Sequence, residues 1–198
     1  MSHPQEVLSF WLGPLDARGW AAAAAMGRWW KKSASFDALC TARFGAMHAA
    51  VVRGDHDDWL ASPRGRLGYV IVLDQLSRNI HRDRPAMFAA DDRALAVARA
   101  GVDAGVDDEL GFHERYFLYM PFMHAEDEAA QTRSVALFRG LGVAFPDLVD
   151  AAAVAVDFAE RHREIVVRFG RFPHRNRILG RESNDEERAF LEQPGSRF

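Results

Sequence analysis

Apolar residues recur along this chain mostly every three or four positions, which is the pattern of amphipathic helices. In the stretch SPRGRLGYVIVLDQLSRNI, residues 62–80, apolar side chains at 69–73, 76 and 80 surround most of the helix. Ser62 fits an N-cap and Pro63 a first helical position. We therefore predict a central helix here, buried on nearly all sides.

The same pattern predicts helices through the rest of the chain. In residues 151–169, Val154, Phe158, His162, Ile165 and Phe169 share one face, and Gly170 follows as a stop. Residues 126–128 are acidic and fit the first turn of a helix that ends at Gly140 or Gly142. A capping box of Ser183 and Glu186 predicts a last helix. The other expected helices are 4–12, 20–31, 36–53, 91–104 and 112–120, with breaks at Gly54, Pro85, Gly105 and Pro121.

Strand signals are almost absent, because no Asn-Gly or Asp-Gly turn separates alternating apolar runs. The chain has 198 residues, of which 48% are hydrophobic and 27% charged, which fits one globular domain with a substantial core. We predict an all-α domain over residues 1–198, built from antiparallel helix pairs.

Charge and cysteine content narrow the possible partners and location. The net charge of −3 argues against general nucleic-acid binding. Cys40 is the single cysteine, so no internal disulfide can form, and a small buried hydrophobe is its expected role. The start lacks a signal-peptide pattern, and no apolar run approaches the ~18 residues of a membrane span. We expect a soluble, cytoplasmic protein with no membrane or nucleic-acid partner.

The predicted central helix carries a polar face. Asp74, Arg78 and Arg82 recur every four residues on one side. A carboxylate in such an apolar setting must be paired. One interpretation is a structural Asp74–Arg78 ion pair, with Asn79 capping a helix end. The other is a face turned toward a ligand.

An aromatic and methionine-rich stretch, YFLYMPFMHAED at 116–127, leads into His124 and Glu126. His-x-Glu alone is a weak metal signal, so we predict no metal site and place His124 at the edge of a pocket. His162, on an apolar face, fits a hydrogen-bonded core histidine. Trp29 and Trp30 are expected to pack into the core.

The arginine-rich stretch RFGRFPHRNRILGRES, residues 168–183, is the strongest candidate for binding. Arginine forks match carboxylate and phosphate oxygens, and a turn held by Gly170 and Pro173 could aim its polar side chains at one point. Those side chains are Arg171, His174, Arg175 and Asn176. Alternatively, they satisfy helix carbonyls and pair with Asp74 or with the acids at 126–128. No nucleophile elbow, P-loop or dinucleotide fingerprint is present.

With these motifs, the chain resembles a bacterial family catalogued as domain of unknown function nine hundred and twenty-four. The matching blocks are VLSFWLG at 7–13, WWKK at 29–32, LDQLSRNIHRD at 73–83, FAADDRAL at 88–95, ERYFLYMPFMHAED at 114–127 and HREIVVRFGRFPHRNRILGRESNDEERAFL at 162–191. The resemblance implies a tetratricopeptide-like α-α superhelix, although no repeat is visible in the chain. It implies no activity. The family's motif residues, carried onto this chain, are Asp74, Gln75, Arg78, Asn79, His124, Glu126, His162, Arg171, His174, Arg175 and Asn176.

We predict that the central helix, the 124–127 turn and the 168–181 loop converge on one polar pocket. Its floor would be Asp74 and Arg78, and its walls Phe117, Tyr119 and Phe122. The predicted ligand-binding residues are Asp74, Arg78, Asn79, His124, Glu126, Arg171, His174, Arg175 and Asn176.

Three functions remain open for such a pocket. It could bind a small anion or a peptide carboxylate. It could be an enzyme that uses His124 or His162 as acid or base. It could also be a structural polar network without a ligand. The sequence indicates no particular cofactor, substrate or oligomeric state.

Overall fold

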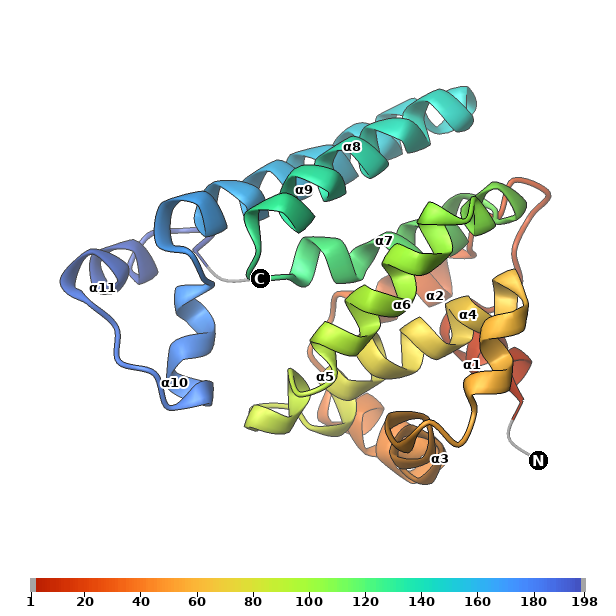
Figure 1. Ribbon diagram of the computed structural model, residues 1–198, viewed down its shortest axis with the longest axis horizontal. Coiled ribbons are helices and arrows are strands. Elements are labelled where there is room, and N and C mark those ends of the chain that lie inside the picture. Colours follow the sequence, from red (N-terminus) through yellow and green to blue (C-terminus); the bar gives the residue numbers. More distant parts are fainter. Residues whose placement is uncertain (1–2, 197–198) are drawn as a thin grey trace.

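The computed structural model describes residues 3–196, and these residues form helices joined by short turns (Figure 1). Within this range the structure holds no β-strand, only an isolated bridge between Leu15 and Ala21. The longer helices are α1 (Pro4–Trp11), α2 (Ala23–Trp29), α3 (Ala34–Arg53), α6 (Asp91–Asp103), α7 (Phe112–His124), α8 (Glu128–Ala144) and α9 (Val149–Phe169). The all-α prediction is confirmed, whereas the single domain and the tetratricopeptide-like superhelix stay predictions.

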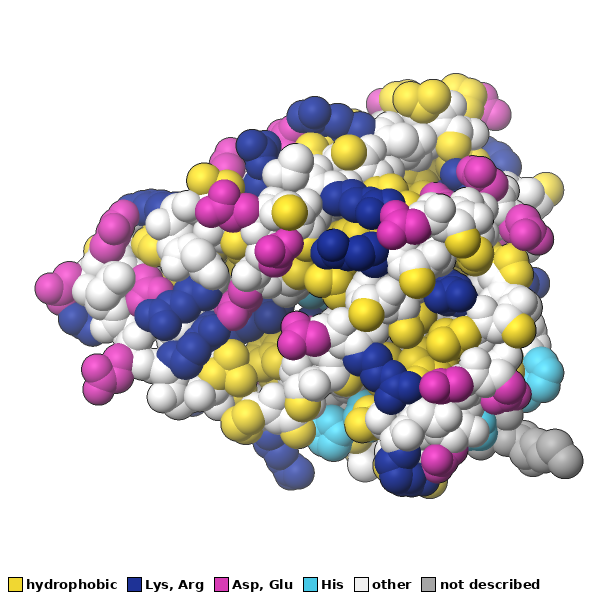
Figure 2. Space-filling view, viewed as in Figure 1, with side chains coloured by type: hydrophobic (Ala, Val, Ile, Leu, Met, Phe, Trp, Pro, Cys, Tyr) yellow, Lys and Arg dark blue, Asp and Glu magenta, His cyan; other side chains and the backbone are white. Residues whose placement is uncertain are grey.

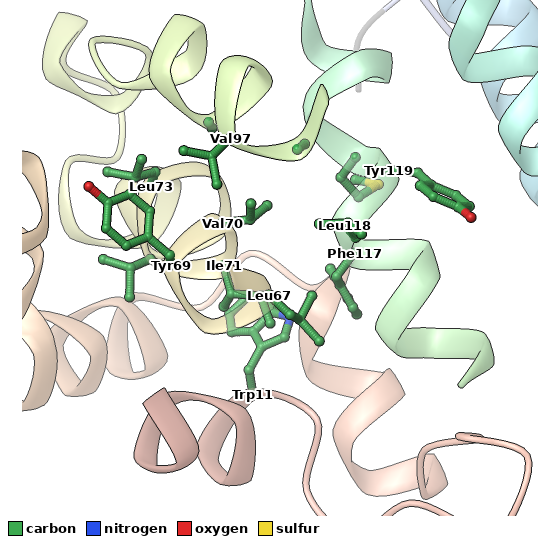
Figure 3. Close-up of a cluster of buried hydrophobic side chains, with 14 of the residues drawn as sticks. Trp11, Leu67, Tyr69, Val70, Ile71, Leu73, Val97, Phe117, Leu118 and Tyr119 are labelled. Carbon is green, nitrogen blue, oxygen red and sulfur yellow. The ribbon is translucent and has the colours of Figure 1, made fainter. Parts of the chain in front are cut away.

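The central helix is continuous from residue 63 to residue 80, in three parts. These are α4 (Pro63–Val70), a π-helical stretch η2 (Ile71–Leu76) and α5 (Ser77–Ile80). Ser62 caps it as predicted, because its side chain accepts a hydrogen bond from the backbone N–H of Gly65 at 3.2 Å. Every residue of η2 is buried. Figure 3 shows Val70, Ile71 and Leu73 of this helix packed among side chains from its neighbours.

Helix α7 runs through Pro121, where the sequence predicted a break. Proline removes one helical hydrogen bond and costs about 3 kcal/mol in a helix interior. Here Phe117, Leu118, Phe122 and Met123 are all buried around it. Since burying each such side chain contributes roughly 1.5–3 kcal/mol, packing outweighs the lost bond.

Helices α8 and α9 pack side by side as a long antiparallel pair (Figure 1). Neither Gly140 nor Gly142 ends α8, which continues to Ala144. At Gly142 an added Cβ would come 3.4 Å from the Cβ of Ala152, so the two helices lie close together there. The buried face of α9 includes Ala152, Ala155, Ala159, His162 and Ile165. The predicted face was therefore wrong in part: small residues let the two helices approach, and Val154 and Phe158 are left outside.

Beyond α9, the chain reverses at Gly170, whose φ of 68° is left-handed, as expected of a helix stop. It then forms η6 (Pro173–Arg175), α10 (Asn176–Leu179) and α11 (Asp185–Leu191). Asn184 and Glu187 form the capping box of α11, one residue later than predicted. Figure 2 shows basic and acidic side chains interspersed over this end of the molecule.

The remaining turns are the 3-10 segments η1 (Asp57–Ala61), η3 (Pro85–Met87), η4 (Val106–Glu109) and η5 (Pro146–Leu148). Within residues 3–196, no helix is both long enough and apolar enough to span a bilayer.

Candidate functional site

A carboxylate–histidine pair lies at the centre of the molecule. Asp74, fully buried in η2, has its Oδ1 2.7 Å from Nδ1 of His124 at the end of α7. Burial opposes ionisation of Asp74, but Arg78 and His124 overcome it, so its pKa lies well below the ordinary value. Burial and the nearby Arg78 lower the pKa of His124. The carboxylate is therefore ionised and the imidazole neutral, with Nδ1–H donating to Asp74.

Two guanidinium groups converge on Asp91, in the first turn of α6. Arg78 donates from Nη1 and Nη2 to the two carboxylate oxygens, both at 3.0 Å. Arg175 of η6 donates to Oδ2 at 3.2 Å. The expected Asp74–Arg78 pair is also present, at 3.2 Å. Asp91 therefore ties the central helix, α6 and the arginine-rich loop together, and the sequence interpretation had missed it.

Arg175 is itself buried, with 6% of its surface exposed. Its guanidinium lies 4.6 Å from the ring centres of both Phe88 and Phe172, and Nη2 donates to the carbonyl of His124 at 2.9 Å. Its Nε–H has no hydrogen-bond partner among the described residues. Burial is the main reason that its pKa falls to about 10, despite the neighbouring Asp91.

Arg78, His124 and Arg175 line a cavity of about 860 Å³. Its apolar walls come from the N-terminal segment, α7, α9 and the loops around Phe88 and Phe172. They include Trp11, Trp20, Trp29, Trp30, Phe112, Tyr116, Met120, Met123, Val154 and Phe158. Its cationic side chains are Lys31, Lys32, Arg78, Arg82, Arg161 and Arg175. Among the described residues that line it, Asp83 is the one carboxylate.

The predicted aromatic walls were on the wrong side of α7. Phe117, Tyr119 and Phe122 are buried in the core, and the Tyr119 hydroxyl donates to Asp107. The cavity is instead lined by Tyr116, Met120 and Met123. These positions are spaced by four and three residues, so they share one helix face. The sequence interpretation had identified the segment but not which of its two apolar faces meets the cavity.

One interpretation of the sequence was that Asn79 caps a helix end. In the structure its side chain bonds instead to a carboxylate on another helix. Its Nδ2 donates to Oδ1 of Asp37 in α3 at 2.8 Å, and Arg82 donates to the same carboxylate from Nε and Nη2. Both side chains line the cavity. Asp37 therefore holds Asn79 of the central helix and Arg82, just beyond its end, at the cavity edge.

Half of the arginine-rich loop belongs to a separate structural network. Arg171 donates to both oxygens of Glu187, at 2.7 and 2.9 Å. Arg181 donates to both oxygens of Glu126, which also accepts the backbone N–H of Phe172. Asn176, almost fully buried, bonds to Ser183, Glu187 and Arg181.

Neither Arg171 nor Asn176 lines the cavity, and Glu126 lines a second hollow of about 380 Å³ instead. Each of these three side chains has a protein partner in the structure, and their predicted ligand contacts stay predictions. The second hollow lies beside the first, because His124, Phe88 and Arg175 line both.

His162 and His174 line the same cavity as His124. The His162 ring centre is 6.5 Å from that of His124, and its Nδ1–H donates to the carbonyl of Phe158 at 2.7 Å. Burial lowers the pKa of His162 to about 3. Burial and Arg175 lower the pKa of His174 to about 4. The cavity therefore presents neutral imidazoles beside permanent cations.

The residues that sequence reasoning missed are mostly aromatic. Trp30 follows α2 and is 60% exposed, so it is not a core residue. Phe158 faces the cavity from α9 rather than the core. One signal in the sequence could have identified Phe158. It is a large apolar side chain that lies off the face of small residues by which α9 packs on α8. Only the fold places Trp30 against α7, with its ring centre 6.0 Å from that of Tyr116.

Within residues 3–196, no three His, Cys, Asp or Glu side chains are placed to hold a metal ion. His124 and Glu126, the weak metal candidates, bond instead to Asp74 and Arg181.

Known proteins are similar to this chain over nearly its whole length. A family model described as "Bacterial protein of unknown function (DUF924)" matches residues 7–195. A solved structure, that of a protein of unknown function from Agrobacterium tumefaciens, is 37% identical with a TM-score of 0.82. The match covers 96% of each chain. Among curated proteins, none matches.

Proposed function

Because the chain belongs to the bacterial family of unknown function DUF924, whose description names no activity, we propose a function from the geometry of the cavity. The protein binds a small amphipathic anion: an aromatic or aliphatic body in the apolar part, with a carboxylate or similar group against the arginines and lysines. The observation that carries the proposal is the cavity of about 860 Å³, with aromatic walls and clustered cationic side chains.

The size and lining suit a small molecule. Small-molecule sites are concave, of about 300–1,000 Å³, mostly apolar, with few polar groups that fix orientation. Tryptophan, tyrosine, phenylalanine and methionine side chains supply the apolar surface here. Such walls would bury an aryl or alkyl group of a ligand and favour binding through the hydrophobic effect.

The charge distribution supports an anion. Asp37 and Asp74 pair with Arg82 and Arg78 but do not line this cavity. The guanidinium groups of Arg78 and Arg82 are therefore part of the lining, while the carboxylates that pair with them lie outside it. Lys31, at the rim, has no acidic side chain within ion-pair distance among the described residues. A ligand carboxylate would meet donors on several sides.

The experiment compares phenylbutyrate with its neutral, equally sized amide, phenylbutyramide, by titration calorimetry. We expect the carboxylate to bind at least about tenfold more tightly, since a charge-assisted hydrogen bond contributes roughly 1.5–3 kcal/mol. Replacing Lys31 and Lys32 by Gln should weaken binding of the carboxylate by up to about fivefold per charge, because exposed ion pairs contribute about 0.2–1 kcal/mol.

The matched control is Arg53→Gln, which removes an exposed cation that pairs with Asp55 outside the cavity. That variant should bind like the wild type. Equal affinity for acid and amide, or binding of neither, would overturn the proposal.

A further inference from the structure

We propose that the cavity is catalytic: it hydrolyses an ester of an amphipathic anion, with His124 as general base and a water molecule as nucleophile. This inference rests on the proposed function, because the substrate must first be held by its anionic and apolar parts. Three features of the described residues carry it: the Asp74–His124 pair, the composition of the cavity lining and the unpartnered N–H of Arg175.

The Asp74–His124 pair determines which nitrogen is available as a base. Nδ1 of His124 lies 2.7 Å from the ionised Asp74, which can only accept, so the ring proton sits on Nδ1. Asp74 is fully buried and does not line the cavity, whereas His124 does. Nε2 is therefore the unprotonated nitrogen, on the edge of the ring that is turned away from the carboxylate. Asp74 is the positioning residue that holds this tautomer.

Other titratable groups also face His124. Arg78 lies on the central helix, Asp91 on α6, His162 on α9, and His174 and Arg175 on η6. The cations disfavour a protonated imidazole, and the two carboxylates favour it. Burial and Arg78 prevail, so the base is already neutral at neutral pH.

The cavity lining indicates water as the nucleophile. No serine, threonine or cysteine is among the described residues that line it. Ser77 of the central helix bonds to His48 on the far side, at 2.7 Å. Cys40 is buried elsewhere, and burial raises its pKa to about 11. Tyr116 brings the one hydroxyl among the described lining residues, and burial raises its pKa to about 12, which makes it a poor nucleophile. A covalent acyl-enzyme on serine, threonine or cysteine has no carrier in the described lining, which leaves water activated by His124.

The Nε–H of Arg175, which has no hydrogen-bond partner among the described residues, is suited to stabilise the negative charge that develops on the ester carbonyl oxygen. A buried donor without a partner costs about 1–3 kcal/mol, so a group that accepts its bond recovers that free energy. Nη1 and Nη2 of Arg175 already bond to Asp91 and to the carbonyl of His124. These bonds fix the guanidinium beside the base. The Nε–H is left to donate to the oxyanion of a tetrahedral intermediate once a bound ester opens access to this buried atom.

The reaction balances with water as the sole co-reactant. Nε2 of His124 takes a proton from water while the water oxygen bonds to the ester carbonyl carbon. The carbonyl oxygen becomes the oxyanion beside Arg175. On collapse, the bond from carbon to the leaving oxygen breaks, and the proton on Nε2 passes to that oxygen. The products are an acid and an alcohol, and the histidine is neutral again.

The test uses the mono-para-nitrophenyl ester of adipate, an anion, with its neutral methyl ester as comparator. Nitrophenol release is followed at the isosbestic wavelength of nitrophenol and nitrophenolate, so that its own ionisation does not bias the rate. We expect turnover with a preference for the anionic ester in kcat/KM. His124→Asn keeps an amide donor near Nδ1 for Asp74 but removes the base. It should lower kcat by at least about 100-fold and leave phenylbutyrate affinity within about twofold.

His56→Gln is the matched control, because His56 stacks on Trp59 outside the cavity. It should leave kcat unchanged. Asp74→Asn should lower kcat and shift the acid limb of kcat/KM to lower pH, since the carboxylate supports a protonated imidazole. A purely structural role for Asp74 would lower activity without moving that limb.

The outcomes separate the two proposals. If the wild type binds phenylbutyrate but does not hydrolyse the anionic ester, the catalytic inference fails and the binding function stands. If His124→Asn hydrolyses the ester as fast as the wild type, the assignment of the base fails. If phenylbutyrate does not bind, the proposed function fails first.

Discussion

Replacing Asp91 by Asn should destabilise the protein much more than replacing Arg175, one of its two arginine partners. Asp91 accepts three guanidinium hydrogen bonds, two from Arg78 and one from Arg175, and its side chain is only 15% exposed. Removing one partner of a buried ion pair costs about 3–5 kcal/mol, because the remaining charge stays buried. Asp91→Asn leaves Arg175 facing an amide and Arg78 with Asp74 as its remaining carboxylate partner. We therefore expect a loss of about 3–5 kcal/mol.

Arg175→Met should cost much less. Asp91 keeps both bonds from Arg78, and methionine fills much of the space between Phe88 and Phe172. The substitution also removes the unpartnered Nε–H, whose burial itself costs about 1–3 kcal/mol. We expect a loss of about 1 kcal/mol.

The assay is urea unfolding at pH 7, in which the free energy of unfolding is read from the midpoint and slope. Asp92→Asn is the matched control, because Asp92 is also in the first turn of α6 but is exposed. It carries the same helix-dipole contribution, about 0.3–1 kcal/mol, without the buried pairs. Two results would refute the reasoning that Asp91 compensates both arginines. One is an equal loss of unfolding free energy in Arg175→Met and Asp91→Asn, and the other is an equal loss in Asp91→Asn and Asp92→Asn.

Three further predictions concern the scaffold. Gly19→Ala should cost at least about 2 kcal/mol by thermal unfolding, because Gly19 has a φ of 77° and an added Cβ would lie 2.4 Å from Cα of Gly111. Gly27→Ala, with no atom within 4 Å of the added Cβ, should be neutral or stabilising, so equal losses would contradict this reasoning. Cys40 should react with a thiol reagent only on unfolding, since burial raises its pKa to about 11, and rapid labelling of the native protein would count against it. Stability should fall from pH 6.5 toward pH 4, because histidines with lowered folded pKa values bind protons only when unfolded, each contributing up to about 1.4 kcal/mol per pH unit. They are the buried His48, His113 and His162 and the half-buried His174. Urea unfolding that gave equal stability at pH 7 and pH 5 would show that these side chains titrate normally.

The helices were largely predictable because their signals are local. Ser62, Pro63 and Gly170 act on the few residues beside them, and the structure has each where the pattern placed it. Pro121 failed as a break because its effect depends on packing, which sequence spacing does not carry. The shift of the capping box from Ser183 to Asn184 has the same origin, since Asn176 bonds to the Ser183 hydroxyl from outside the helix.

The site was predictable only in part because its partners are distant in sequence. Asp74, Arg78, His124 and Arg175 do come together, as buried or clustered charges must be compensated. Which arginine pairs with which carboxylate depends on how the helices cross in space, and the sequence pattern does not specify those crossings.

Arg171 and Arg175 look alike in sequence, yet one pairs with Glu187 and the other with Asp91. Phe117 and Tyr116 are neighbours, and one is in the core while the other faces the cavity. A shift of one residue along a helix turns a side chain by about 100° and so decides whether it faces the core or the cavity.

The π-helical stretch Ile71–Leu76 has a consequence for insertions and deletions in this chain. Such a stretch accommodates one residue more than an α-helix would over the same length. Deleting a single residue between 71 and 76 would let this stretch close into a regular α-helix, because the widened turn had taken up the extra residue. The segments on either side would keep nearly the same faces, and Arg78 and Asn79 would still point toward Asp91 and Asp37. Removing a residue from α4 or α5 would instead rotate everything downstream by about 100°, so the π-helical stretch is where the central helix best tolerates a shorter chain.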